Sequence, residues 1–211
     1  MQLFSFFSSS TAFRVRIALA IKGVDCEYKA VNLRAGEQHQ LAFLECNPSG
    51  GVPALIDDDF SLGQSLAILD YLDSSYPEPR LIPADPQQRA RVVELANVIA
   101  CDIHPLNNLR VQLYLKNSLG VTEEQKNTWY RHWVEQGFTV VERLLETHGD
   151  LPYCFGSAPT VADCCLIPQV WSAARAGTDI TAYPRIHAIY HHCMKQPAFI
   201  QAAPEQQPDA P

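Results

Sequence analysis

Short apolar runs, each closed by a polar turn, fill the first third of the chain. Residues 3–7 are apolar apart from one serine, and a cluster of serine and threonine at positions 8–11 follows them. Apolar residues then recur at helical spacing as far as Gly23, a residue typical of a helix C-terminus. Residues 26–31 alternate as a second strand does. The pattern therefore predicts a strand, a helix and a strand in that order.

Two further strands and a helix complete the first predicted domain. Residues 54–56 and 60–62 have the composition of strands, and three aspartates between them indicate a turn. A helix follows over residues 64–71. Together these elements predict a small α/β domain with a mixed sheet over residues 1–80.

A proline-rich stretch separates this domain from a helical one. Prolines at positions 77, 79, 83 and 86 exclude a continuous helix or a central strand there. Beyond them the spacing predicts an all-α domain over residues 87–211. Its expected helices span residues 87–119, 122–147, 161–174 and 184–194. Capping signals at Thr122 and Thr160 begin two of them, and the proline-rich tail from position 202 is expected to be frayed.

Composition limits the classes of function. The chain has 211 residues, 47% hydrophobic and 18% charged, which suffices for a buried core. Its formal net charge of −7 argues against nucleic acid or an anionic membrane as partner. A small acidic substrate stays open, because a few local arginines can outweigh the global charge. No apolar run approaches the roughly 18 residues of a membrane span, and the N-terminus lacks a signal-peptide pattern, so we expect a cytoplasmic protein.

The seven cysteines form no recognisable motif. They stand at positions 26, 46, 101, 154, 164, 165 and 193, with no C-x-x-C pair and no spacing typical of a metal site. We therefore expect reduced thiols and no bound metal.

Three short motifs stand where helices or strands are predicted to begin. They are Ser8, Ser9, Ser10 and Thr11; Val52 and Pro53; and Gln64 and Ser65. The first either lowers the pKa of a thiol through its hydroxyls and the helix dipole or simply caps the helix. The second contains either a cis peptide that turns Val52 towards an extended ligand or an ordinary trans proline. The third either holds a carboxylate or is another cap.

Taken together, the motifs resemble the glutathione transferase family, and in particular its zeta class, the maleylacetoacetate and maleylpyruvate isomerases. The resemblance is carried by residues 9–19, Asn47-Pro48 with Val52-Pro53, Gln64-Ser65, Asp102-Ile103-His104-Pro105, and Pro168-Gln169-Val170 ahead of Arg175. These motifs span nearly the full length. The resemblance implies a thioredoxin-like α/β N-terminal domain, an all-α C-terminal domain and a homodimer.

The sequence departs from the usual zeta-class signature at two positions. Thr11 stands where the family usually has cysteine, and Ser8 stands where it usually has arginine. Threonine at this place and the stretch at residues 101–108 are similar to the maleylpyruvate isomerases, which favours maleylpyruvate as the substrate. Because Ser8 replaces that arginine, the contact that the family's arginine is expected to make with a substrate carboxylate is missing here.

The resemblance also implies which residues form the site. Glutathione would be bound by Ser9, Thr11, Gln38, Val52, Pro53, Gln64, Ser65, His104 and Asn108. Ser9, Ser10 and Thr11 would stabilise its thiolate, and Arg110 and Arg175 would hold the carboxylates of a small dicarboxylic acid. Without the resemblance, both arginines are interpreted as solvated helix residues. Arg14 and Arg16 point to different faces of the first helix, one expected at the site and the other at the domain interface.

The implied reaction is a glutathione-dependent cis–trans isomerisation in aromatic compound catabolism. A thiolate adds to the cis double bond of maleylpyruvate or maleylacetoacetate, the new single bond rotates, and loss of the thiolate gives the fumaryl isomer. Two alternatives stay open: a general glutathione transferase that conjugates electrophiles, and a non-catalytic glutathione-binding module. A thiol oxidoreductase is disfavoured, because no cysteine stands at the start of the first helix.

Overall fold

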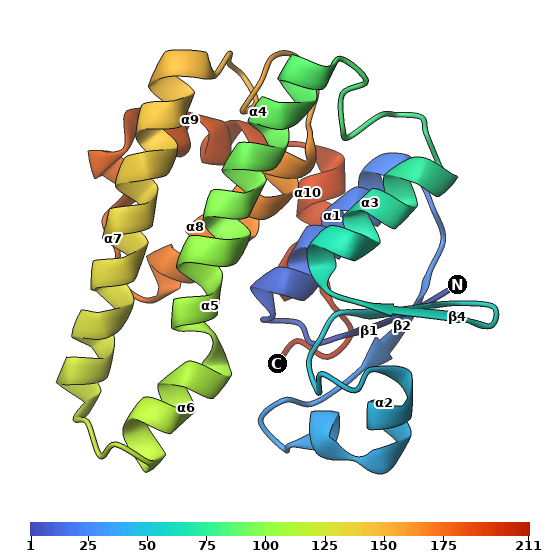
Figure 1. The fold of residues 1–211 in the computed structure, drawn as a ribbon, viewed down its shortest axis with the longest axis vertical. Coiled ribbons are helices and arrows are strands. Elements are labelled where there is room, and N and C mark those ends of the chain that lie inside the picture. The colour runs from blue at the N-terminus through green and yellow to red at the C-terminus, as the bar shows by residue number, and fades with distance from the viewer. The chain divides into compact units, whose positions relative to one another are not determined.

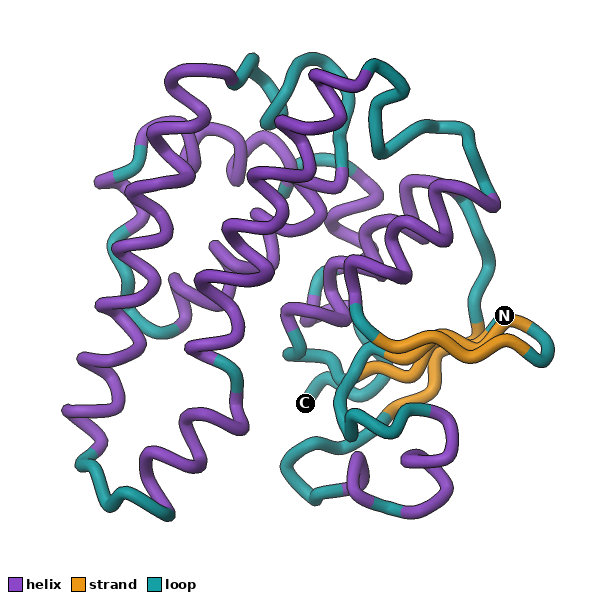
Figure 2. Tube along the Cα trace, viewed as in Figure 1, coloured by secondary structure: helices purple, strands orange, loops and turns teal.

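A computed structural model describes residues 1–211, which form two compact units (Figure 1). The first contains Met1–Ile82 and Met194–Pro211, and the second contains Pro83–Cys193. All strands of the sheet belong to the first unit, and the second is built from helices (Figure 2). The sequence predicted domains over residues 1–80 and 87–211. The difference lies in Met194–Pro211, which the structure groups with the first unit.

The sheet of the first unit has four strands in the order β2-β1-β3-β4. β1 (Gln2–Ser5) pairs parallel with β2 (Glu27–Ala30) and antiparallel with β3 (Ala54–Asp57), which pairs antiparallel with β4 (Phe60–Gly63). Parallel neighbours need a crossover, which α1 (Ser10–Lys22) supplies, whereas β3 and β4 need only a tight turn. The predicted mixed sheet is confirmed.

Successive side chains of β1 point to opposite faces of this sheet. Leu3 is buried and lines a cavity together with Leu19 of α1. Phe4 packs edge-on against Phe43, with 5.7 Å between ring centroids. Figure 1 accordingly shows α1 and α3 (Ser65–Ser75) on one side of the sheet and α2 (Leu41–Cys46) on the other. The sequence did not predict α2, because a helix of 6 residues gives too little periodicity.

Helix α1 begins and ends where the sequence signals predict. Ser9 is its N-cap, and the Ser9 Oγ accepts a hydrogen bond from the Ala12 N–H at 3.2 Å. At the other end Gly23 has a left-handed backbone with φ of 62°, and its N–H donates to the Ala20 carbonyl. The predicted order of strand, helix and strand is therefore confirmed.

The second unit is built from helices, as predicted, but its first predicted helix is divided. Its helices are α4 (Pro86–Asn97), a π-helical turn η2 (Val98–Ile103), α5 (His104–Asn107), α6 (Leu109–Asn117), α7 (Glu123–His148), α8 (Val161–Arg175), a 3-10 turn η3 (Ile180–Ala182) and α9 (Pro184–Cys193). The prediction of one helix over residues 87–119 was wrong. Pro105 lacks an N–H, and Asn108 has extended backbone with ψ of 149°. No helix combines the length and apolar character needed to cross a membrane.

Both predicted capping boxes are present. At the start of α7, Thr122 Oγ1 accepts from the Gln125 N–H, and the Gln125 side chain accepts from the Thr122 N–H. At the start of α8, the Asp163 carboxylate accepts from the N–H groups of Thr160 and Cys154, each at 2.8 Å. Burial raises the pKa of Asp163. These contacts fix the start of α8 and the loop before it.

The C-terminal segment is ordered against the first unit, so the expectation of a frayed tail was wrong. It contains α10 (Pro197–Ala202) and a 3-10 turn η4 (Pro204–Gln206). Arg16 Nε donates to the Ala202 carbonyl at 2.9 Å, and Asp209 accepts from the Phe7 N–H at 2.9 Å. Composition alone could not reveal these contacts, since their partners lie at the other end of the sequence.

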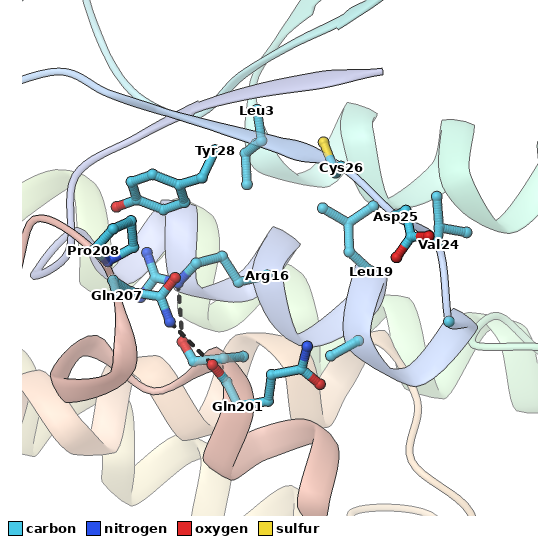
Figure 3. A pocket seen from close by; sticks show the side chains of 13 residues that line it. Leu3, Arg16, Leu19, Val24, Asp25, Cys26, Tyr28, Gln201, Gln207 and Pro208 are labelled. Carbon is cyan, nitrogen blue, oxygen red and sulfur yellow. Dashed lines mark hydrogen bonds between the residues drawn. The ribbon is translucent and has the colours of Figure 1, made fainter.

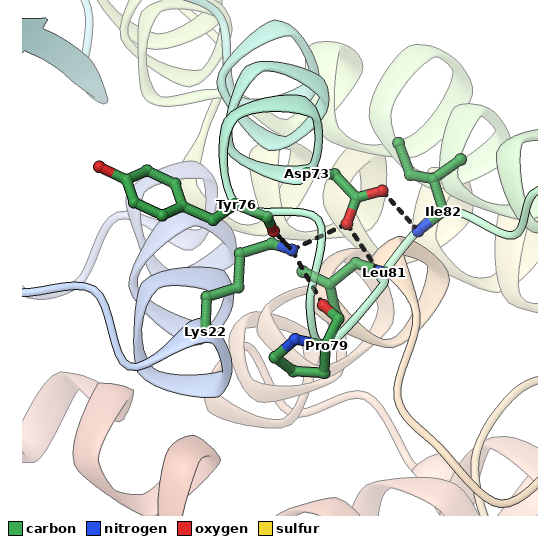
Figure 4. A network of polar contacts seen from close by, with 6 residues as sticks. All are labelled: Lys22, Asp73, Tyr76, Pro79, Leu81 and Ile82. Carbon is green, nitrogen blue, oxygen red and sulfur yellow. Dashed lines mark hydrogen bonds and ion pairs between the residues drawn. The ribbon is translucent and has the colours of Figure 1, made fainter.

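A buried ion pair fixes the stretch that follows α3 (Figure 4). Lys22 Nζ lies 2.8 Å from Asp73 Oδ1 and also donates to the carbonyls of Tyr76 and Pro79. The Asp73 carboxylate accepts from the N–H groups of Leu81 and Ile82. The two side chains are 0% and 6% exposed. The pair therefore holds residues 76–82, which end the first segment of this unit, against α1 and α3.

Replacing Asp73 with alanine is expected to lower the free energy of unfolding by about 3–5 kcal/mol, because it leaves a buried ammonium group without its counter-charge. The midpoint of urea unfolding measures this. Replacing Glu94 with alanine is the matched control, since its pair with Arg91 is exposed and is worth about 0–1 kcal/mol. Equal shifts for the two variants would contradict the assignment.

Candidate functional site

The first unit brings the hydroxyl cluster and Val52 together. Thr11 Oγ1 donates to the Val52 carbonyl at 2.9 Å, and Ser9 Oγ lies 3.0 Å from Thr11 Oγ1. Ser9 and Thr11 are half-buried, whereas Ser10 is buried. The Val52–Pro53 peptide bond is cis, as one of the two alternatives for this dipeptide required, and the pairing of Val52 with a ligand stays a prediction.

A count of protons distinguishes the two half-buried hydroxyls. Each hydroxyl has one proton to donate. The proton of Thr11 is directed to the Val52 carbonyl. The oxygen of Ser9 already accepts from the Ala12 N–H at the positive end of α1. Ser9 is therefore the hydroxyl whose proton can turn to an anion at this helix start, and Thr11 supports it as a neighbouring acceptor.

The start of α3 is a second polar feature of the same unit. Gln64 is exposed and has a left-handed backbone with φ of 66°, and Ser65 after it is buried. Arg14 Nη1 donates to Ser65 Oγ at 3.2 Å from a side chain that is 2% exposed. A helix N-terminus backed by a guanidinium group favours a carboxylate. Of the two arginines of α1, Arg14 is thus the one that reaches a predicted site residue.

Gln38 stands apart from these features. It lies in the 3-10 turn η1 (Glu37–His39), where its Nε2 is 3.2 Å from His39 Nε2. No hydrogen bond joins it to the hydroxyl cluster or to the start of α3. Its role in binding glutathione stays a prediction.

In the second unit, Arg175 is the last residue of α8 and is exposed. Its guanidinium carbon lies 4.5 Å from the centroid of the Trp171 ring. Contact with the ring face holds the guanidinium group beside Trp171 and leaves its N–H donors available for a carboxylate. Burial raises the pKa of Tyr130 to about 12, although the Arg175 charge acts in the opposite direction, so this phenol stays neutral.

Arg110, His104 and Asn108 lie together around the start of α6. The Asn108 side-chain oxygen accepts from the Arg110 N–H at 3.0 Å, and its Nδ2 lies 3.1 Å from His104 Nε2. These contacts give Asn108 a capping role in the helix. The Arg110 side chain is exposed. The part of these three residues in binding glutathione or substrate stays a prediction.

The fold and this geometry indicate a protein that binds a thiol ligand and activates its sulfur. A small mixed sheet crossed by α1, with a serine hydroxyl at the start of that helix and no cysteine there, is suited to activating a thiol that comes from a ligand. A second, helical unit carries a stacked arginine.

Comparisons with known proteins identify the family. Residues 1–74 match the N-terminal domain of glutathione S-transferases, and residues 127–192 match the C-terminal domain. The chain belongs to the glutathione S-transferase family, among the zeta-class enzymes. The predicted family and the predicted fold are confirmed.

The similarity extends over whole chains. A probable maleylacetoacetate isomerase of Vibrio cholerae is 49% identical over 211 residues, covering 99% of this chain and 97% of the relative. A holo structure of a maleylpyruvate isomerase, described as a bacterial zeta-class enzyme, has a TM-score of 0.98 and 45% identity over 100% of both chains. A maleylacetoacetate isomerase of Methylobacterium extorquens AM1, solved with malonate and glutathione bound, has a TM-score of 0.93 and 40% identity over 100% of both chains.

Proposed function

We propose that this chain is a glutathione-dependent cis–trans isomerase that converts maleylpyruvate or maleylacetoacetate to the fumaryl isomer in the catabolism of aromatic compounds. The observation that carries the proposal is the Ser9 hydroxyl, which stands at the start of α1 and whose proton, directed to Thr11 Oγ1 in this structure, can turn to a bound thiolate. The chain's whole-length similarity to isomerases of both substrates supports the same reaction.

The first unit offers donors that suit glutathione. No hydrogen bond within the chain uses the Val52 N–H, so this group can pair with the backbone of an extended peptide. The start of α3, with Ser65 and Arg14, suits a carboxylate. Pro53, Gln64 and Gln38 complete the residues that we assign to the cofactor here, with His104 and Asn108 from the second unit.

When bound, glutathione supplies a thiolate that adds to the activated double bond, permits rotation and leaves unchanged. Ser9 donates a hydrogen bond to the thiolate, the dipole of α1 favours the negative charge, and Thr11 and Ser10 complete the hydroxyl cluster at this helix start. Arg175, with Arg110, holds the substrate carboxylates and favours the negative charge that the substrate acquires. No protein thiol takes part.

Between the two substrates we favour maleylpyruvate, because Thr11 and the stretch at residues 101–108 resemble the maleylpyruvate isomerases. A spectrophotometric assay of both acids, with and without glutathione, tests the proposal. We expect turnover only with glutathione, and faster turnover of maleylpyruvate. Stoichiometric loss of glutathione would instead indicate a conjugating transferase, and binding without turnover would indicate a non-catalytic module.

We also propose that the enzyme is a cytoplasmic homodimer, with no nucleic acid or membrane as partner. All seven cysteines are free, as suits a reducing compartment. Sedimentation equilibrium should give twice the mass of one chain.

A further inference from the structure

The position of Ser9 depends on the backbone just before it. The Ser9 N–H donates to the Phe6 carbonyl at 2.9 Å, which closes a turn between β1 and α1. The side chain of Ser9 then caps α1. A shift of the backbone at Phe6 and Phe7 therefore moves the hydroxyl that the proposed function assigns to the thiolate.

Arg16 holds this backbone from within the fold. Its Nη1 donates to Ser5 Oγ at 3.1 Å and to the Phe6 carbonyl at 3.4 Å, and its Nη2 donates to the Phe7 carbonyl at 3.0 Å. Its Nε donates to the Ala202 carbonyl in the C-terminal segment. Burial lowers the pKa of Arg16 to about 10, so the group keeps its charge at neutral pH. All these partners lie in the first unit, which includes the C-terminal segment that the sequence predicted as part of the helical domain.

Asp209 holds the same backbone from the C-terminal segment. Its Oδ2 accepts from the Phe7 N–H at 2.9 Å, and its Oδ1 accepts from the Tyr28 hydroxyl at 2.6 Å. The peptide groups on both sides of Phe7 are thus tied down, the N–H by Asp209 and the carbonyl by Arg16. A charged partner makes each of these hydrogen bonds stronger than one between neutral groups.

A cavity beside these contacts shows what holds the segment. It measures about 290 Å³, and residues of α1, β2 and the C-terminal segment line it, among them Arg16, Tyr28 and Gln207 (Figure 3). Apolar packing between the segment and the sheet is therefore incomplete here. Beside the buried side chains of Phe199 and Ala202, the hydrogen bonds of Arg16 and Asp209 therefore connect the segment to the rest of the first unit.

We propose that Arg16 and Asp209 are positioning residues for the thiolate site, with Asp209 acting from the far end of the chain through the Phe7 backbone. The inference rests on the proposed function, because it assumes that Ser9 meets the glutathione thiolate. Neither residue touches the ligand; both set the place of the turn that carries Ser9.

The test measures the thiol pKa of bound glutathione from the ultraviolet absorbance of the thiolate, together with kcat and KM. In Asp209→Ala we expect a thiol pKa higher by about half a unit to one unit and a kcat/KM about tenfold lower at neutral pH, the cost of one charge-assisted hydrogen bond. The effect should lie in kcat rather than in the KM for the dicarboxylic acid. Asp209→Asn keeps an oxygen acceptor and should recover part of the loss.

Two further variants distinguish an effect on the site from a general loss of folding. Tyr28→Phe removes only the phenol donor to Asp209. It should raise the thiol pKa in the same direction as Asp209→Ala and lower kcat/KM by about twofold. Gln206→Ala is the control, because Gln206 lies in the same segment and is exposed. It should leave all values unchanged.

The outcomes separate the inference from the function it rests on. A folded Asp209→Ala protein with a lower melting temperature but an unchanged thiol pKa and kcat would overturn the inference, since the contact would then be structural only. A wild-type protein that binds glutathione with an unperturbed thiol pKa would instead overturn the assignment of Ser9. A raised thiol pKa in Asp209→Ala, partly restored in Asp209→Asn, would support the proposal.

Discussion

Replacing Ser9 with alanine is expected to lower kcat/KM by about 100-fold, the usual cost of losing one donor to a negative charge in an active site. The thiol pKa of bound glutathione should rise by about one to two units, because the thiolate loses its hydrogen bond and keeps only the helix dipole. Thiolate forms above its pKa, so the activity of the variant should recover as the pH rises.

Two neighbouring hydroxyls serve as controls for this result. Thr11→Val removes a hydroxyl that donates to the Val52 carbonyl, so we expect a smaller loss, of about tenfold. Ser8→Ala should have little effect, because Ser8 precedes the cap. A larger effect for Thr11 than for Ser9 would show that the proton count at this helix start is misassigned.

Replacing Arg175 with alanine should lower kcat/KM for the dicarboxylic acid by about 10- to 100-fold while leaving the affinity for glutathione nearly unchanged. Loss of one charged hydrogen-bonding partner costs about 1.5–3 kcal/mol. Lysine should restore activity only in part, because it keeps the charge but neither stacks in the same way on Trp171 nor presents a planar fork. Calorimetry of glutathione binding, beside steady-state kinetics, separates the two roles.

Arg143→Ala is the matched control for Arg175, because Arg143 is an exposed helix arginine of the same unit. It should leave both quantities unchanged. Equal losses in glutathione affinity and in turnover for Arg175→Ala, or no loss in either, would contradict the assignment of the substrate carboxylates to this residue.

Local signals in the sequence predicted most of the fold. Gly23 ends α1, and Thr122 and Thr160 begin α7 and α8, because each signal acts on the backbone within a few residues of itself. The mixed character of the sheet followed from the order of strands and helices along the chain. The break at Asn108 was missed, because apolar spacing continues through it while the backbone does not.

The candidate site was predictable as a set of residue types but not as a set of contacts. Ser9, Thr11 and Val52 could be singled out from their places at element starts. That the Thr11 proton is directed to the Val52 carbonyl, and so leaves Ser9 as the donor, depends on a contact across 41 positions of the sequence. The link from Asp209 to Phe7 spans 202 positions, and no periodicity or motif reports it.

The central claim is that the chain uses glutathione as a recycled thiol. The most direct measurement follows the cis acid and glutathione together by nuclear magnetic resonance, with glutathione far below the substrate concentration. The account predicts complete conversion to the trans acid, over many turnovers for each glutathione, with the free thiol undiminished at the end. Conversion that stops when the glutathione is used up, or that proceeds equally well without it, would contradict the account.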